Sequence, residues 1–112
     1  MPQYLIELYT PTAAWRALNA VQRAEFLEGI QAAMGGLSEL GIEVLTLSAT
    51  DAAIDRASTH GFMGIWRFPD ASARDALLAG IQASGWYGYF DHVNAAGSAG
   101  DLGSHLAALA SA

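Results

Sequence analysis

The hydrophobic patterns of the 112 residues predict an α+β fold of the βαββαβ type, with one four-stranded antiparallel sheet in the strand order 4-1-3-2. Two observations lead to this fold class. Residues 3–10, 42–48 and 62–68 are rich in β-branched, leucine and aromatic residues, as strands are, and helical periodicity follows the first and the third. Residues 91–96 supply the missing fourth strand. We expect one domain over 1–112, with a core at 3–97.

The first strand has two distinct faces, because side chains alternate along a strand. One face carries Tyr4, Ile6 and Leu8, and the other carries Leu5, Glu7 and Tyr9. The helices of a βαββαβ chain cover one face of the sheet only. We expect the second face, with its carboxylate, to be the one that the helices leave open.

The first helical region carries clear start and stop signals. Thr12 can cap a short turn that contains Trp15, and Asn19 followed by Gln22 resembles a capping box for a helix at 20–40. Gly41 suits the end of that helix.

The second half of the chain repeats the pattern. Residues 49–61 are a connector longer than a tight hairpin needs. Ser72 with Asp75 predicts a capping box for a helix at 73–84. Residues 86–90 have aromatic residues at helical spacing, which favours a helical turn that serves mainly for packing. Asp101 caps a short C-terminal helix over 101–110.

Composition excludes several function classes. The net charge is −6, and the chain has five arginines but no lysine and no cysteine. An acidic chain is unsuited to nucleic acid or to anionic membranes. Without lysine there is no Schiff-base chemistry, and without cysteine there are no thiol nucleophiles, disulfides or zinc-thiolate sites. No signal peptide or membrane-spanning run is evident, so a soluble cytoplasmic protein is expected.

Three segments carry a family resemblance: YLIELYTP at 4–11, IWRFPD at 65–70 and SGWYGYFDHVNAAG at 84–97. The chain resembles the dimeric α/β-barrel superfamily of ferredoxin-like proteins over about residues 3–97, and within it a group of short bacterial proteins of unassigned function. Since the sheet face that the helices leave open would be too large an apolar patch for a monomer, we expect a twofold dimer that packs sheet on sheet. Superfamily members include cofactor-free monooxygenases, haem-degrading monooxygenases and lactone isomerases, so the fold does not select a reaction.

Glu7 is the sharpest candidate for function, because a carboxylate in a central strand is costly to bury unpaired. In the predicted sheet order, His92 and Asn94 share its face. One interpretation is a catalytic dyad in which His92 moves a proton and Glu7 sets its pKa and tautomer. The other is a satisfied polar pair that holds register inside the dimer interface.

Further side chains are candidates for ligand binding. Trp66 and Phe62 share one face of the third strand, where Gly64 leaves room for a ligand, and Leu5 and Tyr9 share the face of Glu7. Asn94 or Tyr9 would bind a carbonyl group. No metal site is expected, and no cofactor, although haem ligation through His60 or His92 stays open.

The sequence therefore predicts a homodimer that binds a small apolar or aromatic metabolite in the barrel cavity. Any chemistry would be cofactor-independent proton transfer of the isomerase, cyclase or monooxygenase type, and whether the protein is an enzyme stays open. The alternative is a non-catalytic ligand-binding or structural homodimer module.

Overall fold

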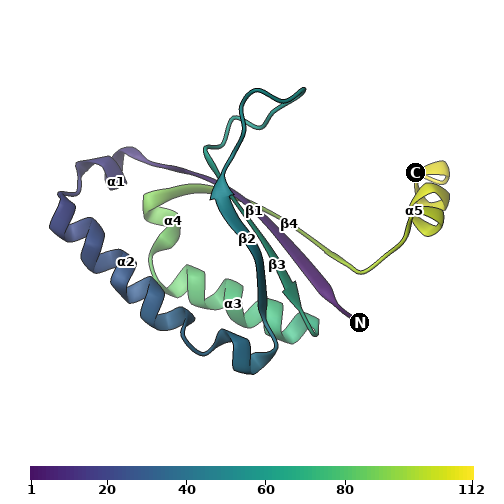
Figure 1. The fold of residues 1–112 in the computed structure, drawn as a ribbon, viewed down its shortest axis with the longest axis horizontal. Helices are drawn as coiled ribbons and strands as arrows, with labels where there is room; N and C mark the ends of the chain where they lie inside the picture. The colour runs from purple at the N-terminus through teal and green to yellow at the C-terminus, as the bar shows by residue number, and fades with distance from the viewer.

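A computed structural model describes residues 1–112 and has the predicted βαββαβ core, with four short helices in addition. The elements are β1 (Gln3–Pro11), α1 (Ala13–Ala17), α2 (Ala20–Met34), η1 (Leu37–Leu40), β2 (Glu43–Ala49), β3 (Phe62–Phe68), α3 (Ala71–Ala83), α4 (Trp86–Tyr89), β4 (Phe90–Ser98) and α5 (Leu102–Ala110). Figure 1 shows α2 and α3 together on one side of the sheet. No helix combines the length and the apolar character needed to cross a bilayer.

The sheet is antiparallel throughout, in the order β2-β3-β1-β4, which is the predicted 4-1-3-2 order read from the other edge. β1 is therefore a central strand. Glu7 lies opposite Gly64 of β3 on one side and Asn94 of β4 on the other. Tyr9 lies opposite His92 in the same way. The predicted proximity of these four polar or aromatic side chains thus follows from the register.

The predicted orientation of the sheet is wrong. The core that packs against the helices comprises Leu5, Ile42, Trp66, Phe68 and Leu77, all less than 10% exposed. Leu5, Glu7 and Tyr9 therefore face the helices. The opposite face, called the outer face below, is that of Ile6, which is 44% exposed, and of Val93, which is 53% exposed. The helix-covered face could take the carboxylate because the neighbouring strands supply partners for it.

The helix starts follow the predicted capping chemistry in two places and depart from it in a third. Thr12 accepts a hydrogen bond from the Trp15 amide, and Asn19 and Gln22 form a complete capping box. For α3, Asp70 and not Ser72 is the cap, since its carboxylate accepts from the Ala73 amide. The helix consequently begins two residues before the predicted position.

The long predicted helix at 20–40 is two helices, because α2 ends at Met34 and η1 follows after Gly35 and Gly36. Gly41 ends η1 with a positive φ of 76°, a conformation that favours glycine. α2 has no buried residue, whereas α3 buries Leu77. α2 therefore stands away from the sheet, and space remains beneath it.

Gly64 is required by the close approach of three elements. A Cβ there would lie 2.9 Å from Leu47 Cδ2 and 3.0 Å from Glu7 Oε1. The space that the sequence suggested for a ligand at this glycine is thus occupied by side chains of the protein itself.

We expect Gly64→Ala to lower the free energy of unfolding by about 1–3 kcal/mol through overpacking, measured by urea denaturation. Gly97→Ala in β4 is the matched control, since a Cβ at Gly97 meets nothing within 4 Å. Equal stability of the two variants would contradict this account.

Candidate functional site

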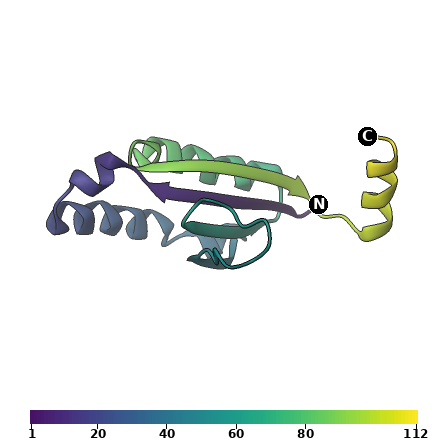
Figure 2. The same cartoon turned by 90° about the horizontal axis from the view of Figure 1, so that it is seen from above.

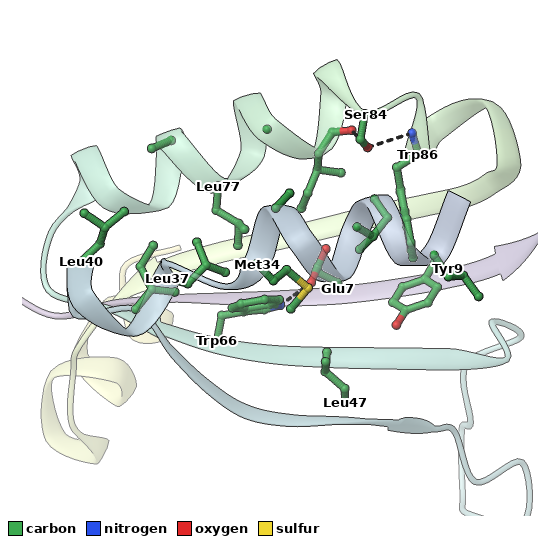
Figure 3. A pocket seen from close by; sticks show the side chains of 17 residues that line it. Glu7, Tyr9, Met34, Leu37, Leu40, Leu47, Trp66, Leu77, Ser84 and Trp86 are labelled. Carbon is green, nitrogen blue, oxygen red and sulfur yellow. Dashed lines mark hydrogen bonds between the residues drawn. The ribbon is translucent and has the colours of Figure 1, made fainter. Parts of the chain in front are cut away.

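A cavity of about 340 Å³ lies between the sheet, α2 and α3 (Figure 3). Hydrophobic residues account for 14 of the 17 that line it. The lining residues are Glu7, Tyr9, Leu27, Ile30, Ala33, Met34, Leu37, Leu40, Ile42, Leu47, Trp66, Ala76, Leu77, Gly80, Ile81, Ser84 and Trp86. The size is at the lower end of the range of roughly 300–1,000 Å³ for small-molecule sites. Glu7 is the only carboxylate in the lining, and no arginine takes part.

Glu7 is 4% exposed, and both of its carboxylate oxygens have partners within the protein. The Trp66 indole N–H donates to Oε1, and His92 Nε2 lies 3.2 Å from Oε2. β3 positions Trp66 and β4 positions His92, one on each side of β1. The buried carboxylate is therefore stabilised by hydrogen bonds from both neighbouring strands, which offsets the cost of removing it from water.

His92 is held by three hydrogen-bonding groups, and its side chain is only 1% exposed. The Trp86 indole N–H donates to Nδ1 at 2.9 Å, while Nε2 lies 2.7 Å from Asn94 Oδ1. An indole nitrogen can only donate, so Nδ1 must be an acceptor and the neutral ring carries its proton on Nε2. That proton points toward Asn94 and Glu7. Trp86 therefore fixes the tautomer, a role that the sequence prediction gave to Glu7.

The site perturbs two ionisable groups. Burial lowers the pKa of His92, but hydrogen bonds to Glu7 and Asn94 and the negative charge of Glu7 outweigh it, so the pKa lies above its ordinary value of 6.5. Burial and, secondarily, the charge of Glu7 raise the pKa of the Tyr9 phenol. At neutral pH the Tyr9 hydroxyl is therefore protonated and able to donate a hydrogen bond.

Aromatic rings surround this polar group. Tyr9 stacks on His92 with ring centroids 5.6 Å apart and planes at 9°, and on Phe62 at 5.9 Å and 15°. Trp86 meets Tyr9 edge to face at 5.3 Å. In Figure 3 Tyr9 and Trp86 lie together at one end of the cavity, with Trp66 and Leu37 toward the other. The arrangement gives the cavity flat walls beside its carboxylate.

The structure separates the predicted site residues into two groups. Glu7, Tyr9 and Trp66 line the cavity. The other four do not: His92 and Asn94 lie behind Glu7 and Tyr9 on β4, Phe62 stacks on Tyr9 and is 41% exposed, and Leu5 is fully buried in the core. Three of the predicted residues thus line the cavity, whereas His92, which the sequence prediction placed at the ligand, lies outside its lining.

Trp86 and Ser84 are lining residues that the sequence analysis missed. Trp86 was assigned to packing from its spacing with Tyr89 and Phe90, and it does stack on Phe90 at 4.0 Å. Its indole nitrogen nevertheless reaches across to the next strand. Ser84 Oγ donates to the Ile81 carbonyl and accepts from the Trp86 amide, which sets the start of α4. The chain has no local signal for these tertiary contacts, since they depend on the turn between α3 and α4.

Both histidines that the sequence left open for haem ligation make hydrogen bonds within the protein. No group of three or more potential metal-ligating side chains is present. Both ring nitrogens of His92 are engaged, and His60 Nδ1 lies 3.0 Å from Thr10 Oγ1 at the base of the 50–61 loop, outside the cavity lining. Neither residue that the sequence left open for haem therefore offers a free nitrogen to an iron in the cavity.

Solved structures share this fold at low sequence identity. A mutant chlorite dismutase from Candidatus Nitrospira defluvii gives a TM-score of 0.70 at 12% identity, over 90% of this chain and 41% of that one. The chain thus spans about two fifths of the length of that enzyme. A hypothetical Arabidopsis thaliana protein gives 0.56 at 11% identity over 90% of each chain.

A cofactor-independent oxygenase from Streptomyces nogalater gives a TM-score of 0.50 at 12% identity, over 90% of this chain and 95% of that one. None of the curated proteins matches the sequence. These likenesses establish the fold, which is the ferredoxin-like βαββαβ fold expected from the sequence. The model of the family of unknown function DUF6616 matches residues 2–112, and the chain therefore belongs to that family.

Proposed function

We propose that the chain binds a small, uncharged, largely aromatic metabolite in the cavity and that Glu7 accepts a proton from it. The observation that carries this proposal is the position of the carboxylate. It is the only carboxyl group on the wall of an otherwise apolar cavity, and it lies beside the flat rings of Tyr9 and Trp86. A buried carboxylate next to an apolar ligand is a suitable base for an acidic C–H or O–H group.

The lining defines the ligand class. No arginine or lysine faces the cavity, so an anionic ligand would find no counter-charge there. A ligand with a hydrogen-bond donor toward Glu7 and an oxygen within reach of the Tyr9 hydroxyl fits the two polar points. These features describe a phenol, an enol or a ketone with an acidic neighbouring C–H.

The role of each group follows from whether it lines the cavity or lies behind the lining. Glu7 would take the proton from the ligand, and Tyr9 would donate a hydrogen bond to the oxygen on which negative charge develops. His92, one layer behind, would be a positioning residue that holds the carboxylate through its Nε2–H group. This order differs from the sequence prediction, in which His92 moved the proton.

The non-catalytic alternative rests on one observation. Both Glu7 oxygens already have partners within the protein, as a purely structural carboxylate would. In that case the protein would bind its ligand without changing it.

We also propose that the chain is a homodimer that packs through the outer face of the sheet. That face carries Ile6, Leu8, Met63, Ile65 and Val93 on adjacent strands, and no helix covers it. An apolar sheet face of this kind is normally covered by another protein surface.

Filling the cavity should abolish ligand binding. The probe is N-phenyl-1-naphthylamine, which is flat, uncharged and carries one N–H donor, and binding is read from its fluorescence increase. Gly80→Phe directs a ring into the cavity from α3, and we expect it to weaken binding at least about tenfold, or 1.4 kcal/mol. Ala79→Phe is the matched control, because the neighbouring residue is exposed and outside the lining. Equal affinity of both variants would place the binding site elsewhere.

Proton transfer can be tested with 2-tetralone, a bicyclic ketone with an acidic C–H beside its carbonyl. In D₂O the base removes that proton to give an enolate and returns a deuteron, which NMR detects. We expect Glu7→Gln to slow the exchange about 10²–10⁴-fold, since the amide keeps the Trp66 hydrogen bond but cannot accept a proton. Glu28→Gln on exposed α2 should leave the rate unchanged. If the unaltered protein exchanges 2-tetralone no faster than buffer, the non-catalytic alternative is favoured.

The Glu7–His92 pair should make stability depend on pH. Because the pKa of His92 is raised in the folded state, its contribution is complete below pH 6.5 and is lost as the pH rises through the folded-state pKa. The free energy of unfolding should therefore fall over that interval in the unaltered protein and stay flatter in His92→Gln. His105→Gln, on the exposed helix α5, should retain the fall. Parallel pH profiles for the unaltered protein and His92→Gln would show that the pair contributes nothing.

A further inference from the structure

The C-terminal arm, residues 99–112, projects from the rest of the molecule. Every residue of the arm from Gly100 onward is exposed, although α5 is a regular helix capped by Asp101. Both views place α5 at the opposite end of the molecule from α2, and in Figure 1 the sheet lies between them (Figures 1 and 2). The arm therefore lies on the outer side of the sheet without touching the helix layer.

One stripe of the projecting helix is apolar. Leu102, Leu106 and Leu109 recur at intervals of four and three residues, so they share one face, and they are 73%, 55% and 57% exposed. The arm carries only one acidic side chain, Asp101, and one histidine, His105. A helix of nine residues is only marginally stable in water without tertiary packing. This helix therefore needs a packing partner to be stable.

The accessible surface and the radius of gyration of the chain are larger than those of a compact monomer of the same size. Its accessible surface is 7322 Å², whereas a compact monomer of 11.7 kDa exposes about 5,900 Å². The excess of about 1,400 Å² exceeds the roughly 800 Å² that each partner buries in a standard interface. The radius of gyration is 16.1 Å, compared with about 13 Å for a compact domain of this length.

From these observations we infer that the arm packs on a second copy of this chain. The leucine stripe of each α5 contacts the edge of the partner's sheet. The two arms thus lie on either side of the sheet–sheet contact. The inference rests on the homodimer proposed above and adds the segment that closes it.

The structure explains why the arm does not turn back onto its own sheet. β1 and β4 pair along their whole length to Ser98, and the Ala99 amide then donates to the Pro2 carbonyl at 2.9 Å. Only Gly100 and Asp101 separate this anchor from the start of α5. The helix is thus held beyond the end of the strands, where a twofold-related copy can reach it.

Two measurements test the arm. In the first, sedimentation analysis compares the full chain with a variant that stops after Ala99. We expect the full chain to dimerise and the shortened chain to have a dimer dissociation constant at least about tenfold higher. Because no arm residue from Gly100 onward is buried, the shortened chain should keep the stability of the folded monomer unit, which urea denaturation checks.

The second measurement identifies the partner surface. The chain has no cysteine, so Ser104→Cys places a single nitroxide label on α5, two residues away from Leu102 and Leu106. Labelled protein is mixed with ¹⁵N-labelled, nitroxide-free chain, and broadening of ¹⁵N amide signals then reports contacts between chains only. We expect broadening along the edge of the partner's sheet. A label at Glu28→Cys, on α2 at the opposite end, should broaden no outer-face signal.

The outcomes separate the two proposals. A dimer whose affinity survives the deletion, with no broadening between chains, overturns the arm contact and leaves the homodimer standing. A full chain that is monomeric at all concentrations overturns both. Neither result affects the cavity, because probe binding is measured independently and its lining contains no arm residue.

Discussion

The burial of one carboxylate, Glu7, in the central strand organises the structure around it. A carboxylate in this position must have hydrogen-bond donors, and β3 and β4 each supply one, from Trp66 and His92. The donors need space, and Gly64 provides it by carrying no side chain. His92 is in turn fixed by Trp86, which comes from the turn before β4. One polar group in the sheet therefore determines side chains on three other elements.

Much of the fold was predictable because it depends on local patterns. The strands were recognised by β-forming residues, and the helix starts by caps such as Asn19 with Gln22. The shared face of Glu7 and His92 followed from strand order and alternation. What the sequence did not reveal was which face the helices cover, since alternation defines two faces without naming either. Choosing the fully apolar face of Ile6 for the core was wrong, because a satisfied carboxylate is no obstacle to burial.

The site was less predictable than the fold, because the role of each residue depends on whether its side chain reaches the cavity or lies behind another side chain. His92 and Glu7 are neighbours in either orientation of the sheet, and only the three-dimensional arrangement shows that the carboxylate reaches the cavity while the imidazole stays behind it. Trp86 illustrates the same limit. Its spacing with Phe90 is that of a packing residue, and it does pack, but its N–H group performs a second task that spacing cannot encode.

The two faces of the sheet meet two different requirements: one face borders a cavity, and the other supplies apolar area for stability. A cavity needs a boundary that is not fully packed, and α2 provides one because none of its residues is buried. A small domain with so loose a helix layer has few sources of stability on that side. The outer face, with Ile6 and Val93 exposed, offers the compensating apolar area if a second copy covers it. Assembly through one face would thus allow the other to remain open for a ligand, and β1, which has Ile6 on one side and Glu7 on the other, is the element that couples them.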